Sequence, residues 1–192
     1  GAADQYVLDY ARSFGVPAAV MRMSCVYGRG QMGTEDQGWV AHFVIASLLG
    51  RPLSIFGDGK QVRDWLFVTD HCSAIRTVLE KGRVGETYNV GGDSERQNIE
   101  VVEAICRLLD QRRPREDGQP RSSQITYVKD RPGHDRRYAI DASKLQGELG
   151  WKPEHTFESG IEFTVDWYLA NQDWVQGILD GSYRLERMGA EA

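Results

Sequence analysis

The sequence predicts an α/β fold, in which helices alternate with short strands. Stretches with apolar residues at helical spacing alternate along the chain with short apolar or alternating stretches typical of strands. A near-continuous apolar run at 18–21 follows a helix and a glycine, as in a buried parallel strand. The pattern becomes less regular in the second half, which therefore predicts a smaller α/β lobe attached to a parallel sheet.

The first half is expected to begin with an amphipathic helix over residues 2–14, ended by Gly15. One strand is then expected over residues 16–28. The elements expected next are a helix at 39–49, strands at 52–56 and 61–68, a helix at 72–81 and a strand at 86–90. Asp70 is placed to cap the helix at 72–81, because a short carboxylate can accept from the exposed N–H groups there.

In the second half, Asn98 is expected to cap a helix whose inner face carries apolar residues up to Leu109. Residues 111–124 carry no pattern and predict a long surface loop. The remaining expected elements are a strand at 125–128, a helix at 141–149 ended by Gly150, and a last helix at 157–169.

Residues 130–138 (DRPGHDRRY) form a strongly charged stretch around a Pro-Gly turn. Guanidinium groups bind phosphate oxygens in pairs, so this stretch suits a pyrophosphate. The alternative is a solvated loop whose arginines pair with its own aspartates. At the other end of the chain, Ser24, Cys25 and Val26 end a predicted parallel strand, where ligands of such sheets bind. The alternative there is that these residues only close the core.

Composition excludes several classes of protein. The chain has 192 residues with 41% apolar residues, which is enough for a globular core. Its net charge of −5 argues against a nucleic-acid-binding protein, and no apolar run is long enough to predict a membrane span. The three cysteines, Cys25, Cys72 and Cys106, lack the spacing of a metal site. We expect reduced thiols in a cytoplasmic protein.

Several motifs together resemble the extended short-chain dehydrogenase/reductase family, whose NAD-dependent epimerases and dehydratases act on nucleotide sugars. They are SCVYG at 24–28, FGDGKQVRDW at 56–65, YNVGG at 88–92, DASKL at 141–145 and LGWKP at 149–153. The resemblance implies that residues 1–92 are the C-terminal portion of a Rossmann-type domain, with residues 30–63 reaching into the second lobe. Residues 93–192 would then be the nucleotide-sugar-binding lobe.

Two groups within this family are similar to different parts of the chain. Residues 125–141 resemble 4,6-dehydratases of the dTDP-glucose type, whereas residues 33–43 resemble CDP-sugar 2-epimerases. The longer similarity favours the dehydratase. The family's Gly-rich NAD motif and its catalytic Tyr-x-x-x-Lys pair do not occur in this sequence. The resemblance therefore implies the C-terminal, substrate-binding half of an enzyme, with no catalytic residue and no activity on its own.

The resemblance also assigns ligand contacts. Arg63 is expected to bind the pyrophosphate, Arg131 and His134 the nucleotide, Asn98 a phosphate, and Phe56 the base. The alternatives are a salt bridge of Arg63 with Asp64, surface positions for the loop residues, and a core position for Phe56. Ser24, Cys25 and Val26 are expected to contact NAD.

Cys25 stands where the family often has asparagine, a departure from the usual contact with the nicotinamide and phosphate. A homodimer or larger species is expected through the first helix, whose Tyr6, Val7, Tyr10 and Phe14 would form an apolar face. A non-catalytic binding module, or a fragment that only associates with itself, stays open as an alternative.

Overall fold

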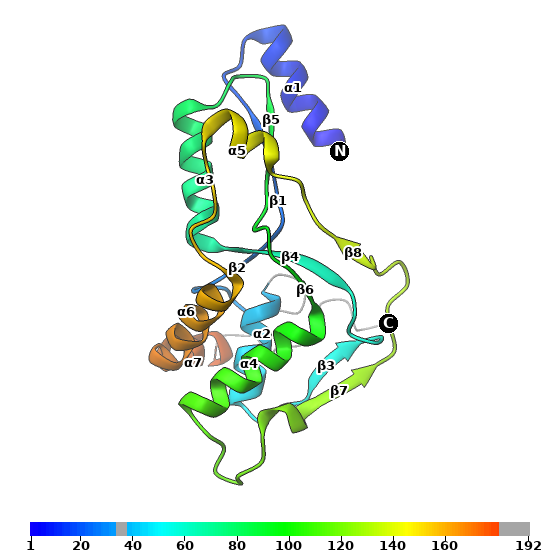
Figure 1. Ribbon diagram of the computed structural model, residues 1–192, viewed down its shortest axis with the longest axis vertical. Coiled ribbons are helices and arrows are strands. Elements are labelled where there is room, and N and C mark those ends of the chain that lie inside the picture. The colour runs from blue at the N-terminus through cyan, green and yellow to red at the C-terminus, as the bar shows by residue number, and fades with distance from the viewer. Residues whose placement is uncertain (34–37, 181–192) are drawn as a thin grey trace.

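The computed structural model describes residues 1–33 and 38–180, which fold into an α/β structure (Figure 1). The helices are α1 (Ala2–Phe14), α2 (Trp39–Leu48), α3 (Val68–Lys81), α4 (Asn98–Arg112), α5 (Ser143–Leu149), α6 (Phe157–Ala170) and α7 (Gln172–Asp180). The strands are β1 (Val20–Met23), β2 (Cys25–Tyr27), β3 (Leu53–Phe56), β4 (Val62–Phe67), β5 (Thr87–Val90), β6 (Glu95–Gln97), β7 (Ile125–Val128) and β8 (Arg137–Tyr138). The predicted fold class is confirmed, since β1 pairs with β5, β2 with β4 and β3 with β7 in parallel.

The prediction of one strand over residues 16–28 is wrong, because the chain forms β1 and β2 with a break at Ser24. The Ser24 N–H still donates to the Val90 carbonyl of β5, at 3.0 Å. The chain then leaves β5, and β2 continues beside β4. β4 also pairs with β6 in antiparallel and with β8 in parallel orientation. β4 is therefore the strand on which the second half of the chain is assembled.

The buried apolar residues form two clusters. The larger cluster lies where α2, α4 and α6 pack against β3 and β4, in the lower part of Figure 1. The smaller cluster lies between α3, β5 and α5, in the upper part. On β4 the consecutive residues Trp65 and Leu66 point to opposite faces, so Trp65 joins the larger cluster and Leu66 the smaller one. Both clusters draw residues from each side of the predicted boundary at residue 92, and the division into two domains there stays a prediction.

Two predicted helix caps are wrong. α3 already begins at Val68, so Asp70 lies in its first turn. The buried Asp70 carboxylate instead accepts from the backbone N–H of His155 at 3.0 Å and contacts its Nδ1 at 2.9 Å. Asn98 is the first residue of α4, and Gln97 is the cap, with its N–H donating to the Glu100 carboxylate at 2.6 Å.

The predicted helix stops at Gly15 and Gly150 are confirmed, because both adopt left-handed backbone conformations with φ of 67° and 72°. α7 and the short strands β6 and β8 were not predicted, and β8 lies in the stretch predicted to be a loop. The predicted loop at 111–124 contains the end of α4 and a 3-10 turn at Arg121–Gln124. Over residues 1–33 and 38–180, no helix combines the length and the apolar character that crossing a membrane requires.

Candidate functional site

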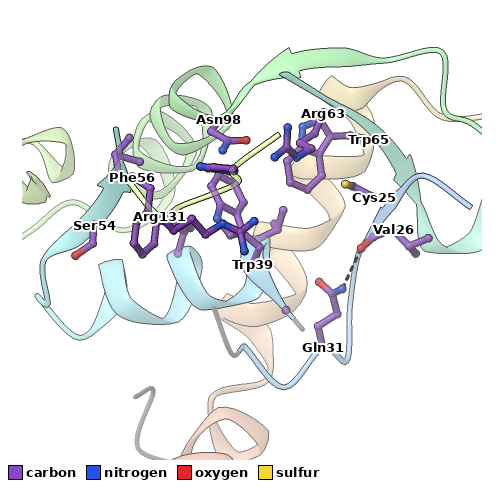
Figure 2. Close-up of a pocket in the computed structure, with 15 residues that line it drawn as sticks. Cys25, Val26, Gln31, Trp39, Ser54, Phe56, Arg63, Trp65, Asn98 and Arg131 are labelled. Carbon is purple, nitrogen blue, oxygen red and sulfur yellow. Dashed lines mark hydrogen bonds between the residues drawn. The ribbon is translucent and has the colours of Figure 1, made fainter. Parts of the chain in front are cut away.

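A cavity of about 340 Å³ lies among elements that are far apart in the sequence (Figure 2). Its wall is formed by β2, the first turns of α2 and α4, the end of β3, β4 and the loop before β8. Every site residue expected from the sequence except Ser24 lines this cavity, and they are Cys25, Val26, Phe56, Arg63, Asn98, Arg131 and His134. The volume is within the range of small-molecule sites. The roles assigned to these residues stay predictions.

Arg63 extends into the cavity from β4 and is anchored at one end of its guanidinium group. Its Nη1 donates to the carbonyl oxygens of Val62, at 2.8 Å, and Asp135, at 3.0 Å. The alternative of a salt bridge with Asp64 does not hold, because the buried Asp64 carboxylate accepts from the backbone N–H groups of Gly92 and Ser94. Arg63 therefore keeps donors for a ligand while its position is fixed.

Asn98 reaches the cavity because it begins α4. Its backbone N–H donates to the Gln61 carbonyl at 3.0 Å, and its amide side chain points toward the cavity (Figure 2). Within the described residues the Asn98 amide has no hydrogen-bond partner. The start of a helix carries partial positive charge, so this end of α4 suits an anionic group.

Two arginines of the charged loop at 130–138 form ion pairs with other segments rather than with the loop's own aspartates. Arg136 pairs with Asp58 at 3.0 Å, and Arg137 pairs with Glu95 at 2.6 Å. Arg131 forms no ion pair within the described residues and lines the cavity. Arg136 and Arg137 therefore attach the loop to other segments, and Arg131 lines the cavity.

His134 lies beside Arg131 in the cavity wall. Its Nδ1 is 2.7 Å from Oδ1 of Asp130, and its side chain is only 7% exposed. The pKa of the Asp130 carboxyl lies below its usual range, mainly because of the hydrogen bond with His134. Asp130 is therefore an ionised carboxylate at neutral pH.

Phe56 lies in the cavity wall at the end of β3. Leu53 and Ile55 are buried, whereas Ser54 and Phe56 on the other face are half-buried, and Ser54, Ile55 and Phe56 all line the cavity. The alternative of an ordinary core position for Phe56 is therefore not what the structure shows. A half-buried aromatic ring in a cavity wall can stack on a planar ring.

Two tryptophans of the cavity wall were not identified from the sequence. Trp39 begins α2 and Trp65 lies on β4, with ring centroids 5.4 Å apart. The Trp65 Nε1 and the Gln31 Oε1 are buried without a hydrogen-bond partner in the described part of the chain. Leaving such an atom unpaired costs about 1–3 kcal/mol, so a polar ligand group that pairs with it would recover that energy. The helix that begins at Trp39 was predicted from the sequence, but the contact of Trp39 with Trp65 was not.

Cys25 and Val26 form the wall at β2. Burial raises the pKa of the Cys25 thiol, so the thiol stays protonated at neutral pH. The Val26 carbonyl accepts from the Gln31 amide at 3.0 Å (Figure 2). Ser24 lies behind this wall, where its hydroxyl is buried without a partner among the described residues. Across residues 1–33 and 38–180, no group of three or more His, Cys, Asp or Glu is arranged to hold a metal ion.

Comparison with known proteins identifies a family and several relatives. The profile of the family described as GDP-mannose 4,6 dehydratase matches residues 1–164. A dTDP-glucose 4,6-dehydratase of Xanthomonas campestris pv. campestris (strain B100) is 65% identical over 189 residues, which are 98% of this chain and 53% of the relative. A dTDP-glucose 4,6-dehydratase of Escherichia coli is 49% identical and is covered to 49% of its length, so the chain spans about half the length of the curated relatives it matches.

Solved structures give the same result. A dTDP-glucose 4,6-dehydratase from Bacillus anthracis in complex with NAD has 45% identity and a TM-score of 0.79, covering 92% of this chain and 52% of that one. The Streptomyces venezuelae enzyme with NAD and TYD (dTDP) bound has 34% identity and a TM-score of 0.80, with coverage of 92% and 51%. Residues 34–37, part of the stretch that resembles CDP-sugar 2-epimerases, lie outside the described residues.

Proposed function

Since the chain belongs to the GDP-mannose 4,6 dehydratase family and matches one half of dTDP-glucose 4,6-dehydratases, we propose that it binds the nucleotide sugar of such an enzyme. The observation that carries the proposal is the convergence of Arg63, Arg131, Asn98 and His134 on one cavity. These side chains come from β4, the start of α4 and the loop before β8. They combine two guanidinium groups with an amide and an imidazole, a set suited to a nucleoside diphosphate.

Each part of the ligand has a matching part of the cavity. The pyrophosphate would lie between Arg63 and Asn98, where a guanidinium group faces the positive end of α4. Arg131 and His134 would contact the nucleotide from the loop, and Phe56 would stack on the base. This assignment leaves the side of Trp39, Trp65 and Gln31 for the sugar.

NAD is the cofactor that the proposal implies. The residues at the carboxyl end of β1 fit one edge of such a group, because the buried Ser24 hydroxyl is unpaired in the described structure and Cys25 and Val26 are half-buried beside it. NAD supplies the acceptor for a hydride of the sugar when it is bound. Ser24, Cys25 and Val26 would contribute contact and position only, and the protonated thiol of Cys25 carries no charge there.

Calorimetric titration of this chain with dTDP tests the proposal. We expect one dTDP to bind per chain, and dTMP to bind at least about tenfold more weakly because it lacks one of the two phosphates. NAD is titrated separately, since binding of dTDP without NAD distinguishes a nucleotide-binding module from a chain that needs both. Tighter binding of CDP than of dTDP would favour the 2-epimerase alternative, and no binding of any diphosphate would contradict the proposal.

We also propose that the chain self-associates through α1. Only Leu8 and Ala11 of this helix are buried, whereas Tyr6, Tyr10 and Phe14 are 71%, 53% and 71% exposed. Such an apolar face is unfavourable in water and typical of an interface. Sedimentation velocity should show a dimer or larger species, and replacing Tyr10 and Phe14 by serine should shift it to monomer. A wild-type monomer at high concentration would contradict the interface.

The three unpaired thiols of Cys25, Cys72 and Cys106 support a cytoplasmic location for the protein.

A further inference from the structure

The carboxylate of Asp130 is held by several groups and in turn holds His134. Its Oδ1 accepts from the backbone N–H of Arg131 at 2.9 Å and contacts His134 Nδ1 at 2.7 Å. Its Oδ2 accepts from the buried amide of Gln61 at 3.0 Å. Both oxygens of this carboxylate are therefore fixed by groups of the loop and of the chain just before β4.

The turn after β3 leaves room for this carboxylate. Gly57 adopts a positive φ of 63°, and a Cβ at this position would lie 2.7 Å from Oδ2 of Asp130. The Gly57 N–H donates to the Val128 carbonyl at 3.0 Å, so the turn and the loop are also joined by their backbones. A side chain at residue 57 would displace the carboxylate, so the absence of one preserves the arrangement.

The contact determines which nitrogen of the imidazole carries a proton. An ionised carboxylate can only accept hydrogen bonds, so Nδ1 of His134 must be the donor. Nε2 is on the other edge of the ring and has no hydrogen-bond partner among the described residues. The bond at one ring nitrogen of histidine fixes the state of the other. Nε2 is therefore the nitrogen left for a ligand in the cavity that His134 lines.

We propose that Asp130 is a positioning residue, which fixes His134 with Nδ1 protonated so that Nε2, the acceptor nitrogen of the neutral ring, meets a hydroxyl group of the bound nucleotide. The inference rests on the proposed function, since it assumes that a nucleoside diphosphate occupies the cavity. Asp130 acts through His134 and does not itself contact the ligand.

The proposal predicts an effect opposite in sign to simple charge repulsion. A carboxylate near an anionic ligand opposes binding, so removing it should strengthen binding if charge alone decided the outcome. If Asp130 positions His134, Asp130→Ala should instead weaken dTDP binding, by about tenfold. Asp130→Asn keeps an acceptor for Nδ1, and Gln61 can turn its amide to match, because Gln61 Oε1 is unpaired in the described structure. The asparagine variant should therefore stay within about threefold of wild type.

A double-mutant cycle, measured by calorimetry with dTDP, tests whether Asp130 affects dTDP binding through His134. His134→Ala should weaken binding about as much as Asp130→Ala, and the double variant should be no weaker than His134→Ala alone. Additive losses, or an unchanged affinity of a folded Asp130→Ala variant, would overturn the proposal. Circular dichroism confirms that each variant is folded. If Asp130→Ala does not fold, Asp130→Asn supplies the test, because an increase in dTDP affinity of more than about threefold would show that charge repulsion decides the outcome.

Nitrogen-15 NMR of the histidine rings reports the same arrangement without a ligand. The His134 signals, assigned by comparison with His134→Ala, should show Nδ1 protonated in wild type and in Asp130→Asn. In Asp130→Ala this preference should be lost. A wild-type ring protonated on Nε2 alone would contradict the proposed positioning. If wild type shows the expected ring state but binds no dTDP, the proposed function fails while the contact between Asp130 and His134 stands.

Discussion

Arg63→Ala is expected to weaken dTDP binding by about 2–3 kcal/mol, which is roughly 30- to 150-fold. The loss is large because this guanidinium group is held in place before any ligand arrives. Two backbone carbonyls, those of Val62 and Asp135, accept from its Nη1. Little further ordering is then needed on binding, and most of the strength of a charge-assisted hydrogen bond is retained. Calorimetric titration with dTDP measures the change directly.

Arg112→Ala is the matched control for charge. Arg112 pairs with Glu162 and Asp166 on α6 and is not part of the cavity wall. Its loss changes the net charge of the chain by the same amount, so dTDP affinity should stay within about twofold of wild type. Arg63→Lys should recover only part of the affinity, because an ammonium group lacks the planar fork. Equal affinities of Arg63→Ala and wild type would remove Arg63 from the site.

Gly92→Ala is expected to lower the free energy of unfolding by about 3 kcal/mol or more. A Cβ at residue 92 would lie 2.0 Å from the backbone oxygen of Trp65 and 3.1 Å from Cα of Leu66. These are backbone atoms of the central part of β4, so they cannot move aside as a side chain would. The Gly92 N–H also donates to the buried Asp64 carboxylate at 2.8 Å, and any shift of this segment would weaken that bond.

Gly147→Ala is the control for the same chemical change in open space. Nothing lies within 4 Å of a Cβ built at residue 147, which is exposed within α5. Alanine favours a helix over glycine, so this variant should gain about 0.5–1 kcal/mol. Urea unfolding of both variants followed by circular dichroism compares them. Equal stabilities of the Gly92 and Gly147 variants would show that the approach of residue 92 to β4 is not as close as described.

The elements that could be predicted from the sequence are those with their own periodicity and stops. α1 and α5 end at the expected glycines because a left-handed residue is a local requirement. β6 could not be predicted, since Glu95, Arg96 and Gln97 carry no alternation and form a strand only because β4 lies beside them. The break at Ser24 was missed for the same reason, because it reflects a change of partner strand rather than any feature of the sequence.

The candidate site was predicted through resemblance to a family, and the structure adds what resemblance did not contain. Trp39 and Trp65 could not be placed together from the sequence, because their contact depends on how α2 packs on β4. Asp130 was recognised only as a charge in a charged loop. Its function as a support for His134 requires a distance between two side chains, which spacing along the chain does not provide.

The arrangement of the two clusters around β4 has a consequence for cooperativity. In sequence the residues of the smaller cluster lie between Leu66 and Trp151, entirely within the span of the larger one, from Tyr27 to Val175. No single cut in the chain can therefore release one cluster intact. Since Trp65 lines the cavity while the next residue, Leu66, packs in the other cluster, we expect β4 and the two clusters to unfold together.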